Sequence, residues 1–317
     1  MLKCHRQSVL VSFAALCCLA LAVPASAQSK SVQWGLDMKK GIAEAQKSKK
    51  PMMVWIIGSS DDRANDAERE QKKSFANPLI VELSKRFVCV RLSRTNNMEL
   101  LKQWNLPPAT NLDIVFVTPA GDKIDTISAV GSTLPESLAQ KMSLVFRSHR
   151  SRLFNDEIKA VLADTSAKPV DLKNALQTIE DLIIDTADSS VVELCKRDGL
   201  DDPTLIRSYA VLAELSTSPA IKFLVDAAAT DKRAADALAK ATPGGAEVLL
   251  EFFDGTDTDK RLLAYTAAAK ICKIKDPKPE GFWKNPNEKI KTDELARVRK
   301  AVESKAKTWR DTIGQYR

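Results

Sequence analysis

The sequence has little of the chemistry on which most catalytic sites depend. Of its two histidines, only His149 lies beyond residue 27, so a Ser-His-Asp or Cys-His arrangement would have to use that side chain. His149 lies among cations near an expected helix end, where we expect a solvated or helix-capping histidine. No spacing of Cys, His and carboxylates suits zinc, and no Gly-x-x-x-x-Gly-Lys phosphate loop occurs. The residues indicate no catalytic, cofactor-binding or metal-binding site.

Two groups of carboxylates are the remaining candidates for a cation site. They are Asp61-Asp62 and the three acids Asp254, Asp257 and Asp259. A calcium loop needs ligands at fixed alternating positions and a closing glutamate, which the second group lacks. We therefore expect a turn and a helix N-cap there.

Cysteine is scarce as well. Beyond residue 27 the chain has Cys89, Cys195 and Cys272, which are far apart in the sequence and form no disulfide framework. We expect buried thiols that pack as small apolar side chains. A Cys195–Cys272 disulfide stays open, because it requires Cα atoms within about 7 Å of each other.

The first 27 residues have the composition of a secretory signal peptide. Lys3 and Arg6 form a basic start, residues 9–23 an apolar core, and Ala25-Ser26-Ala27 a small-residue cleavage site. The apolar run is shorter than the roughly 20 residues of a membrane anchor. We predict a signal peptide at 1–27, a mature chain that begins at Gln28, and a periplasmic or secreted protein without a membrane span.

Lipoprotein processing is the weaker alternative for this segment. Cys17 and Cys18 offer a lipidation site, but Leu16 stands where that processing pattern has a small residue. Cleavage after Ala27 fits the residues better.

Positive charge is concentrated in the first half of the chain. The net charge is +7; residues 28–150 contain 19 basic and 13 acidic residues, whereas residues 151–317 contain 27 and 28. Such an excess is a weak indication of anionic partners and is as often related to solubility. The basic runs in 28–150 are no longer than Lys49-Lys50 or Lys72-Lys73, so we expect no nucleic-acid partner.

The pattern of residues 32–146 alternates between helices and strands. The continuous apolar run 52–57 is typical of a central strand covered on both faces. Thr133 and Glu136 form a capping box that would start the last helix. The expected elements are a helix over 32–48, strands at 52–58, 87–92, 113–118 and 123–128, and helices at 63–73, after Asn77-Pro78, at 98–104 and from 133 onward.

Residues 34–146 resemble a thioredoxin-like domain of the exported type. The matching pieces, in order, are Lys50-Pro51, Phe75-Ala76-Asn77-Pro78, Phe87-Val88-Cys89-Val90 and Val115-Phe116-Val117-Thr118-Pro119-Ala120-Gly121. Each piece is unspecific by itself, and their order and spacing carry the resemblance. It implies α/β/α layers.

The departures from that family concern its chemistry. The resemblance places the Cys-x-x-Cys positions near Ala64 and Ala67, and residues 58–88 contain no cysteine. The cis-proline position of the family falls near Leu112, several residues after Pro107 and Pro108. Thiol–disulfide exchange needs a thiolate and a second sulfur, so we expect a redox-inactive version of the fold.

From residue 151 onward the pattern is helical. Helix starts at Pro203, Asp231 and Asp259 recur every 28 residues, a spacing that accommodates two short helices and their turns. The pattern resembles short HEAT-like repeats, and a solenoid and an irregular bundle both fit it. Further helices are expected at 170–184, 189–197 and 289–316, with an aromatic loop at 277–286 that packs over the last helices.

Together these features predict an α/β plus all-α chain, with a thioredoxin-like domain at 28–150 and a HEAT-like domain at 151–317. The absence of catalytic groups favours a non-enzymatic exported module that binds a protein or peptide partner. The alternatives are a thiol-dependent enzyme that uses Cys89, Cys195 or Cys272 alone, and a structural envelope protein. The sequence does not indicate an oligomeric state.

Overall fold

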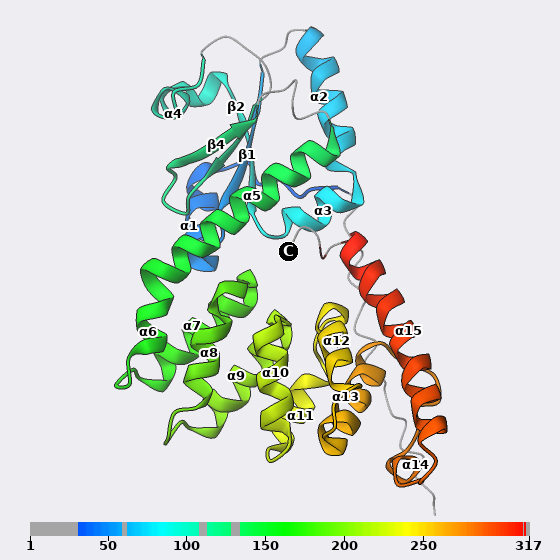
Figure 1. The fold of residues 1–317 in the computed structure, drawn as a ribbon. Coiled ribbons are helices and arrows are strands. Elements are labelled where there is room, and N and C mark those ends of the chain that lie inside the picture. The colour runs from blue at the N-terminus through cyan, green and yellow to red at the C-terminus, as the bar shows by residue number, and fades with distance from the viewer. Residues whose placement is uncertain (1–30, 59–61, 108–112, 128–133, 313, 315–317) are drawn as a thin grey trace, which may run out of the picture.

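The computed structural model describes residues 31–58, 62–107, 113–127, 134–312 and 314, with the backbone alone for 62–67 (Figure 1). A small mixed sheet forms the N-terminal part, and the C-terminal part is helical. The predicted class, α/β plus all-α, is confirmed at this coarse level. The predicted signal peptide lies outside the described residues, as do Asp61, Leu112 and Thr133.

The sheet has the strand order β2-β1-β3-β4. β1 runs parallel to β2, with Met52 opposite Val88, while β3 is antiparallel to both β1 and β4. The all-apolar β1 is central, as its sequence predicts, because both of its faces are covered. All four predicted strands are confirmed: β1 (Met52–Ile57), β2 (Val88–Ser93), β3 (Asp113–Val117) and β4 (Lys123–Ile127).

Helices cover both faces of this sheet. On one face, Ala45 of α1 and Leu101 of α4 belong to the same buried cluster as Val54 and Val90 of the sheet. Trp104, which follows the last residue of α4, is part of this cluster too. The other face is covered by α3 and α5, and its core includes a set of large side chains: Trp55, Phe75, Ile80, Phe116, Leu138 and Phe146. The helices of this part are α1 (Met38–Ser48), α2 (Asp62–Phe75), α3 (Pro78–Ser84), α4 (Met98–Gln103, after the 3-10 turn Thr95–Asn97) and α5 (Pro135–Leu153).

Local capping explains most of these helix boundaries. Asn77 accepts a hydrogen bond from Leu79 N at 2.9 Å and Pro78 occupies the first turn, so α3 is separate from α2 as predicted. The first helix begins only at Met38, after the N-cap Asp37; the prediction that helical structure extends back toward Val32 is wrong, because Gly35 bridges to β2.

The predicted capping box at the start of α5 is also wrong. The N-cap position is occupied by Leu134, which makes no side-chain capping hydrogen bond, and Pro135 begins the helix. The proline fixes a helical φ at the first position, which places the start of the helix one residue later than the Thr133 pattern suggests.

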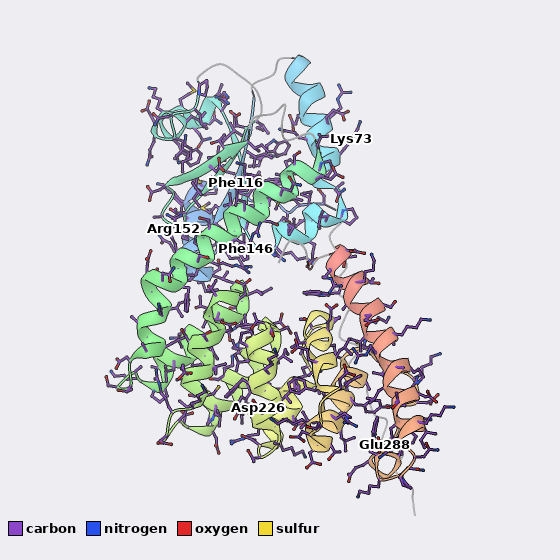
Figure 2. The ribbon with its side chains drawn as sticks, viewed as in Figure 1. Lys73, Phe116, Phe146, Arg152, Asp226 and Glu288 are labelled. Carbon is purple, nitrogen blue, oxygen red and sulfur yellow. The ribbon has the colours of Figure 1, made fainter. Side chains whose placement is uncertain are left out.

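One helical run connects the sheet to the C-terminal region. α5 continues through Arg150 and Ser151 into a π-helical turn (Phe154–Ile158) and then α6 (Lys159–Ala163). Leu153, Phe154 and Ile158 belong to the same buried cluster as the sheet side chains. In Figure 2, Phe116, Phe146 and Arg152 mark this path from the sheet to the end of α5. The apolar core is therefore continuous from the sheet into the helical region.

The C-terminal helices stack in two rows. α7, α9, α11 and α13 contact one another in succession, and α8, α10, α12 and α15 form the second row (Figure 1). The predicted helices are confirmed: α7 (Pro169–Leu182), α8 (Asp188–Cys195, after the 3-10 turn Asp185–Ala187), α9 (Asp202–Leu215), α10 (Ser218–Ala228), α11 (Lys232–Leu238), α12 (Pro243–Leu249, continued by Leu250–Phe252), α13 (Thr258–Ile271) and α15 (Glu288–Thr312).

Aspartates begin several of these helices; the predicted start at Asp231 is confirmed, while the caps of α9 and α13 lie two residues before the predicted starts at Pro203 and Asp259. The side chains of Asp201, Asp231 and Asp257 accept hydrogen bonds from backbone N–H groups in the first turns of α9, α11 and α13. The predicted aromatic loop contains a short helix, α14 (Glu280–Trp283). Trp283 packs edge-on against Tyr265 at 4.6 Å, which confirms that this loop covers the last helices.

Candidate functional site

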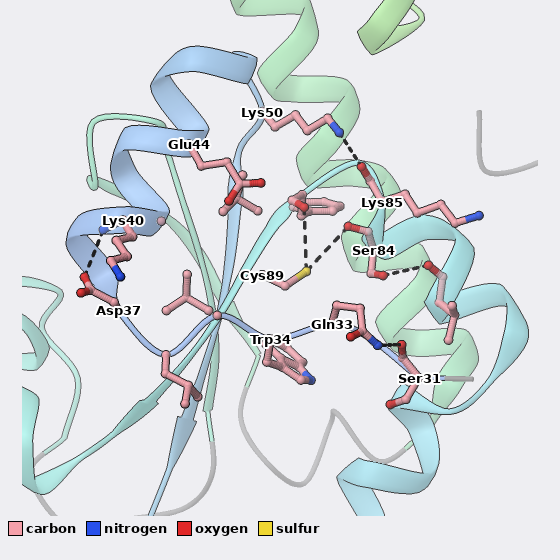
Figure 3. Close-up of a pocket in the computed structure, with 17 residues that line it drawn as sticks. Ser31, Gln33, Trp34, Asp37, Lys40, Glu44, Lys50, Ser84, Lys85 and Cys89 are labelled. Carbon is pink, nitrogen blue, oxygen red and sulfur yellow. Dashed lines mark hydrogen bonds between the residues drawn. The ribbon is translucent and has the colours of Figure 1, made fainter. Parts of the chain in front are cut away.

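A groove of about 580 Å³ follows the outer edge of β2 (Figure 3). α1 borders it on one face of the sheet and α3 on the other. Its lining mixes apolar with polar and charged side chains, and Leu36 at its margin is 68% exposed. The apolar side chains of the lining are Trp34, Leu36, Val81, Phe87, Val88 and Val90.

The backbone of β2 faces this groove. Gly35 N donates to the Cys89 carbonyl at 2.9 Å, and Arg91 N donates to the Gly35 carbonyl at 2.8 Å. A strand residue points its N–H and C=O to the same edge, so the Cys89 N–H also points toward the groove. β2 is an edge strand, and the chain's own Gly35 already pairs with this edge between Cys89 and Arg91, so a further extended chain could add only beside that bridge.

Charged groups surround the apolar lining. Lys50 Nζ donates to the Lys85 carbonyl at 2.8 Å, which ties the end of α3 to the start of β1. The Asp37 side chain accepts from Lys40 N at 3.0 Å; this backbone hydrogen bond lowers the pKa of Asp37. These groups fix the helix ends that form the walls, so the groove is held open by existing contacts.

Cys89 lies half-buried in the groove with no activating partner. Its Sγ is 3.7 Å from the Ser84 carbonyl and 3.9 Å from the Phe87 carbonyl. Burial raises the pKa of Cys89 to about 12, which outweighs the opposing effect of Lys50. A thiol in this state stays protonated at neutral pH and is a poor nucleophile.

The other two cysteines are in similar surroundings. Burial raises the pKa of Cys195 to about 12 and also raises the pKa of Cys272. All three thiols are free in the structure, so Cys195 and Cys272 are not joined by a disulfide. The expected packing of the thiols is confirmed for Cys272, which is buried, and holds in part for the half-buried Cys89 and Cys195.

Of the two alternatives expected for His149, the solvated one is wrong and the helix-capping one agrees with the structure. The side chain is 7% exposed, and its Nε2 lies 2.8 Å from the carbonyl oxygen of Lys49. Since a carbonyl only accepts, Nε2 carries the proton. His149 thus caps the C-terminal end of α1, not its own helix, and burial lowers its pKa.

The predicted carboxylate sites separate in the structure. Asp257 caps α13, and Asp254 accepts from Arg299 of α15 at 2.8 Å, in agreement with the turn and N-cap prediction. Among the described residues, no three His, Cys, Asp or Glu side chains gather in a group that could hold a metal ion. Ala64 and Ala67 lie in α2, within the segment for which only the backbone is described.

The sequence analysis missed the groove because it assigned the residues before Met38 to a helix. Gly35, between Trp34 and Leu36, is a weak signal of close approach to a strand edge, because the position does not require glycine. A Cβ at Gly35 would lie 3.6 Å from the Cys89 carbonyl oxygen, which is an ordinary contact. The bridge is thus specified by the extended backbone of this segment more than by the glycine.

Comparison with known proteins gave no identification. No protein-family model matches the chain, and no curated protein shows significant similarity to it. Within the described part of the chain, no helix combines the length and the apolar character that a bilayer crossing requires.

Proposed function

We propose that the protein is an exported, non-enzymatic interaction module that holds an extended segment of a protein partner in the β2-edge groove. Its first half is proposed to be a redox-inactive thioredoxin-like domain, and its second half a HEAT-like array that contributes partner surface. Export predicts that the mature chain begins at Gln28, which N-terminal sequencing of the secreted material tests.

The strand connections support the thioredoxin-like assignment. A parallel β1/β2 pair linked through helices, followed by the β3–β4 hairpin and a covering helix α5, is the arrangement that the resemblance implies. The positions near Ala64 and Ala67 supply no thiol. The remaining thiols have raised pKa values, so disulfide exchange is not the proposed activity.

The two rows of helices support the HEAT-like assignment. Each helix of the α7–α13 row contacts the next member of its row, as expected for stacked pairs. Ion pairs join successive members: Arg207 of α9 contacts Glu180 of α7, and Arg233 of α11 contacts Asp202 of α9 at 2.6 Å.

The observation that carries the proposal is the groove beside the Gly35 bridge at the edge of β2, with the exposed Leu36 in its lining. A peptide that adds to an edge strand gains main-chain hydrogen bonds, and neighbouring apolar surface receives its side chains. Here the edge of β2 beside the Gly35 bridge presents the outward N–H of Cys89, and the exposed Leu36 and half-buried Trp34 present apolar surface in the same groove.

Site-specific cross-linking of the full-length mature protein tests this function. A photoreactive residue at position 36 should capture a defined partner, and Leu36→Asp should abolish its capture by an affinity-tagged chain. Leu144 is a matched control, because it is 56% exposed on α5 and does not line the groove. Equal loss with Leu144→Asp, or turnover of a substrate by the purified protein, would contradict the proposal.

A further inference from the structure

A second pocket, also of about 580 Å³, lies at the corner between α13 and α14. Tyr265 of α13 is buried in its floor, and the half-buried Ile274 follows the helix. The apolar part of the lining consists of Leu262, Tyr265, Ala269, Ile274, Pro277 and Pro279. The pocket shares no lining residue with the β2-edge groove.

Lysines surround this apolar floor. Lys270, Lys273 and Lys278 line the pocket, and all three side chains are exposed. Among the described residues, no ion pair joins any of these three to a carboxylate. The acidic residue of the lining, Glu280, forms an ion pair with Lys284 at 3.1 Å. The lining therefore has three lysines against one carboxylate and carries a net positive charge, although residues 151–317 as a whole are almost neutral.

The floor is held rigid by groups other than the lysine ammonium groups. Tyr265 OH donates to the buried Glu294 at 2.7 Å and accepts from the backbone N of Lys278 at 2.6 Å. Trp283 packs on Tyr265 and on Phe282, with ring centroids 4.6 and 5.3 Å apart. These hydrogen bonds use the backbone of Lys278 and none of the three ammonium groups, of which that of Lys278 lies over the Phe282 ring, 6.0 Å from its centroid.

We propose that this pocket binds an acidic peptide segment of a protein partner, with an apolar side chain on the Tyr265–Ile274 floor and flanking carboxylates on Lys270, Lys273 and Lys278. This inference rests on the proposed interaction function and names the contact made by the helical array. Charge complementarity argues for the acidic flanks. The apolar floor argues for a peptide, because a small inorganic anion would leave that floor exposed to water.

Fluorescence anisotropy with the full-length mature protein tests the pocket. The probe is a fluorescein-labelled hexapeptide of sequence Glu-Leu-Glu-Glu-Phe-Glu, and its companion has serine in place of leucine and phenylalanine. The pocket variant is the triple substitution Lys270→Ala, Lys273→Ala and Lys278→Ala. The control variant replaces three exposed lysines outside the pocket with alanine and loses the same charge: Lys159, Lys173 and Lys300.

We expect the pocket variant to weaken probe binding by about tenfold or more, and the control variant by less than about twofold. Thr266→Trp, which fills the pocket from an exposed position of α13 and keeps every lysine, should also weaken binding. Equal losses in both triple variants, or equal affinity for the serine companion, would overturn the inference.

Two further arms separate the ligand classes and the two surfaces. Binding of inorganic phosphate, or of vesicles containing anionic lipid, that matches probe binding would replace the peptide with a different anion and overturn the inference. If the pocket variant binds the probe normally while Leu36→Asp still abolishes partner capture, only this inference fails. If Leu36→Asp has no effect, the proposed groove function fails independently of the pocket.

Discussion

The imidazole of His149 in α5 donates its Nε2 proton to the carbonyl oxygen of Lys49 at the end of α1, over 2.8 Å. The contact joins residues 100 positions apart, from two helices that cover opposite faces of the sheet. Arg152, Glu157 and Lys49 supply the charges around it. The same neighbourhood contains an ion pair between Lys49 and Glu157, so two interactions hold this junction together.

This contact predicts a loss of stability in mild acid. Burial lowers the folded-state pKa of His149 below the unfolded value of about 6.5, so in the window between them the unfolded chain binds more protons. The free energy of unfolding should therefore fall as pH drops through that window, by about 1.4 kcal/mol for each unit that separates the two values. Urea unfolding at pH 7.5 and 5.5 measures it. His149→Gln should flatten the dependence; an unchanged slope in that variant would assign the effect to other groups.

Arg150 should be a major stabilising residue of the chain. Its side chain is 3% exposed, contacts the Ile183 carbonyl and pairs with Asp185 at 2.8 Å, which connects α5 to the segment after α7. Arg150→Ala removes charge-assisted hydrogen bonds from a buried position and should lower the free energy of unfolding by about 3 kcal/mol. Arg152→Ala, two residues on and exposed, is the control and should cost less than about 0.5 kcal/mol. Equal losses in the two variants would argue against the role of Arg150.

The thiols should react slowly in the native protein. A pKa of about 12 for Cys89 and Cys195 leaves a thiolate fraction at pH 8 that is about a thousandfold below that of an ordinary thiol. Labelling with a chromogenic disulfide reagent should therefore show slow native reaction and fast reaction of all three cysteines in denaturant. Mass spectrometry after mild oxidation should find no Cys195–Cys272 link. One rapidly labelled native thiol would support the thiol-enzyme alternative instead.

Gly41 should not tolerate a side chain. A Cβ at this position would lie 2.6 Å from Val90 Cγ2 and 2.8 Å from Met52 Cε, both side-chain atoms of the sheet. Gly41→Val should push α1 away from β1 and β2 and cost about 1–3 kcal/mol of stability. Ala43→Val, at an exposed position of the same helix, provides the control for the lower helix propensity of valine. A thermal shift no larger than that of the control would show that α1 can adjust without loss.

The sequence was most informative where local chemistry decides the structure. The apolar run of β1, the Asn77-Pro78 break and the aspartate caps of α9, α11 and α13 are local signals, and the structure agrees with each. The environment of His149 was not predictable, because its partner is a backbone carbonyl 100 residues away. The β2-edge groove depends in the same way on a tertiary contact between Gly35 and a strand more than fifty residues later.

The pocket between α13 and α14 was also not predictable from the sequence. Four lysines between residues 270 and 278 are visible in the sequence, but their charge is of interest only because Tyr265 and Ile274 form an apolar floor beneath them. That floor depends on the contact between α14 and α13, which has no signature beyond the presence of Phe282 and Trp283.

The helical run from Pro135 to Ala163 is unbroken, and one buried apolar cluster extends along it from the sheet to the helical rows. Because the buried cluster extends from the sheet into the helical rows, the chain is expected to unfold as one cooperative unit. A ligand that binds only the native state raises the unfolding free energy of such a unit by RT ln(1 + [L]/Kd), wherever it binds. Peptide at the edge of β2 and peptide at the α13–α14 corner would then shift one shared melting transition, and their separate shifts would add.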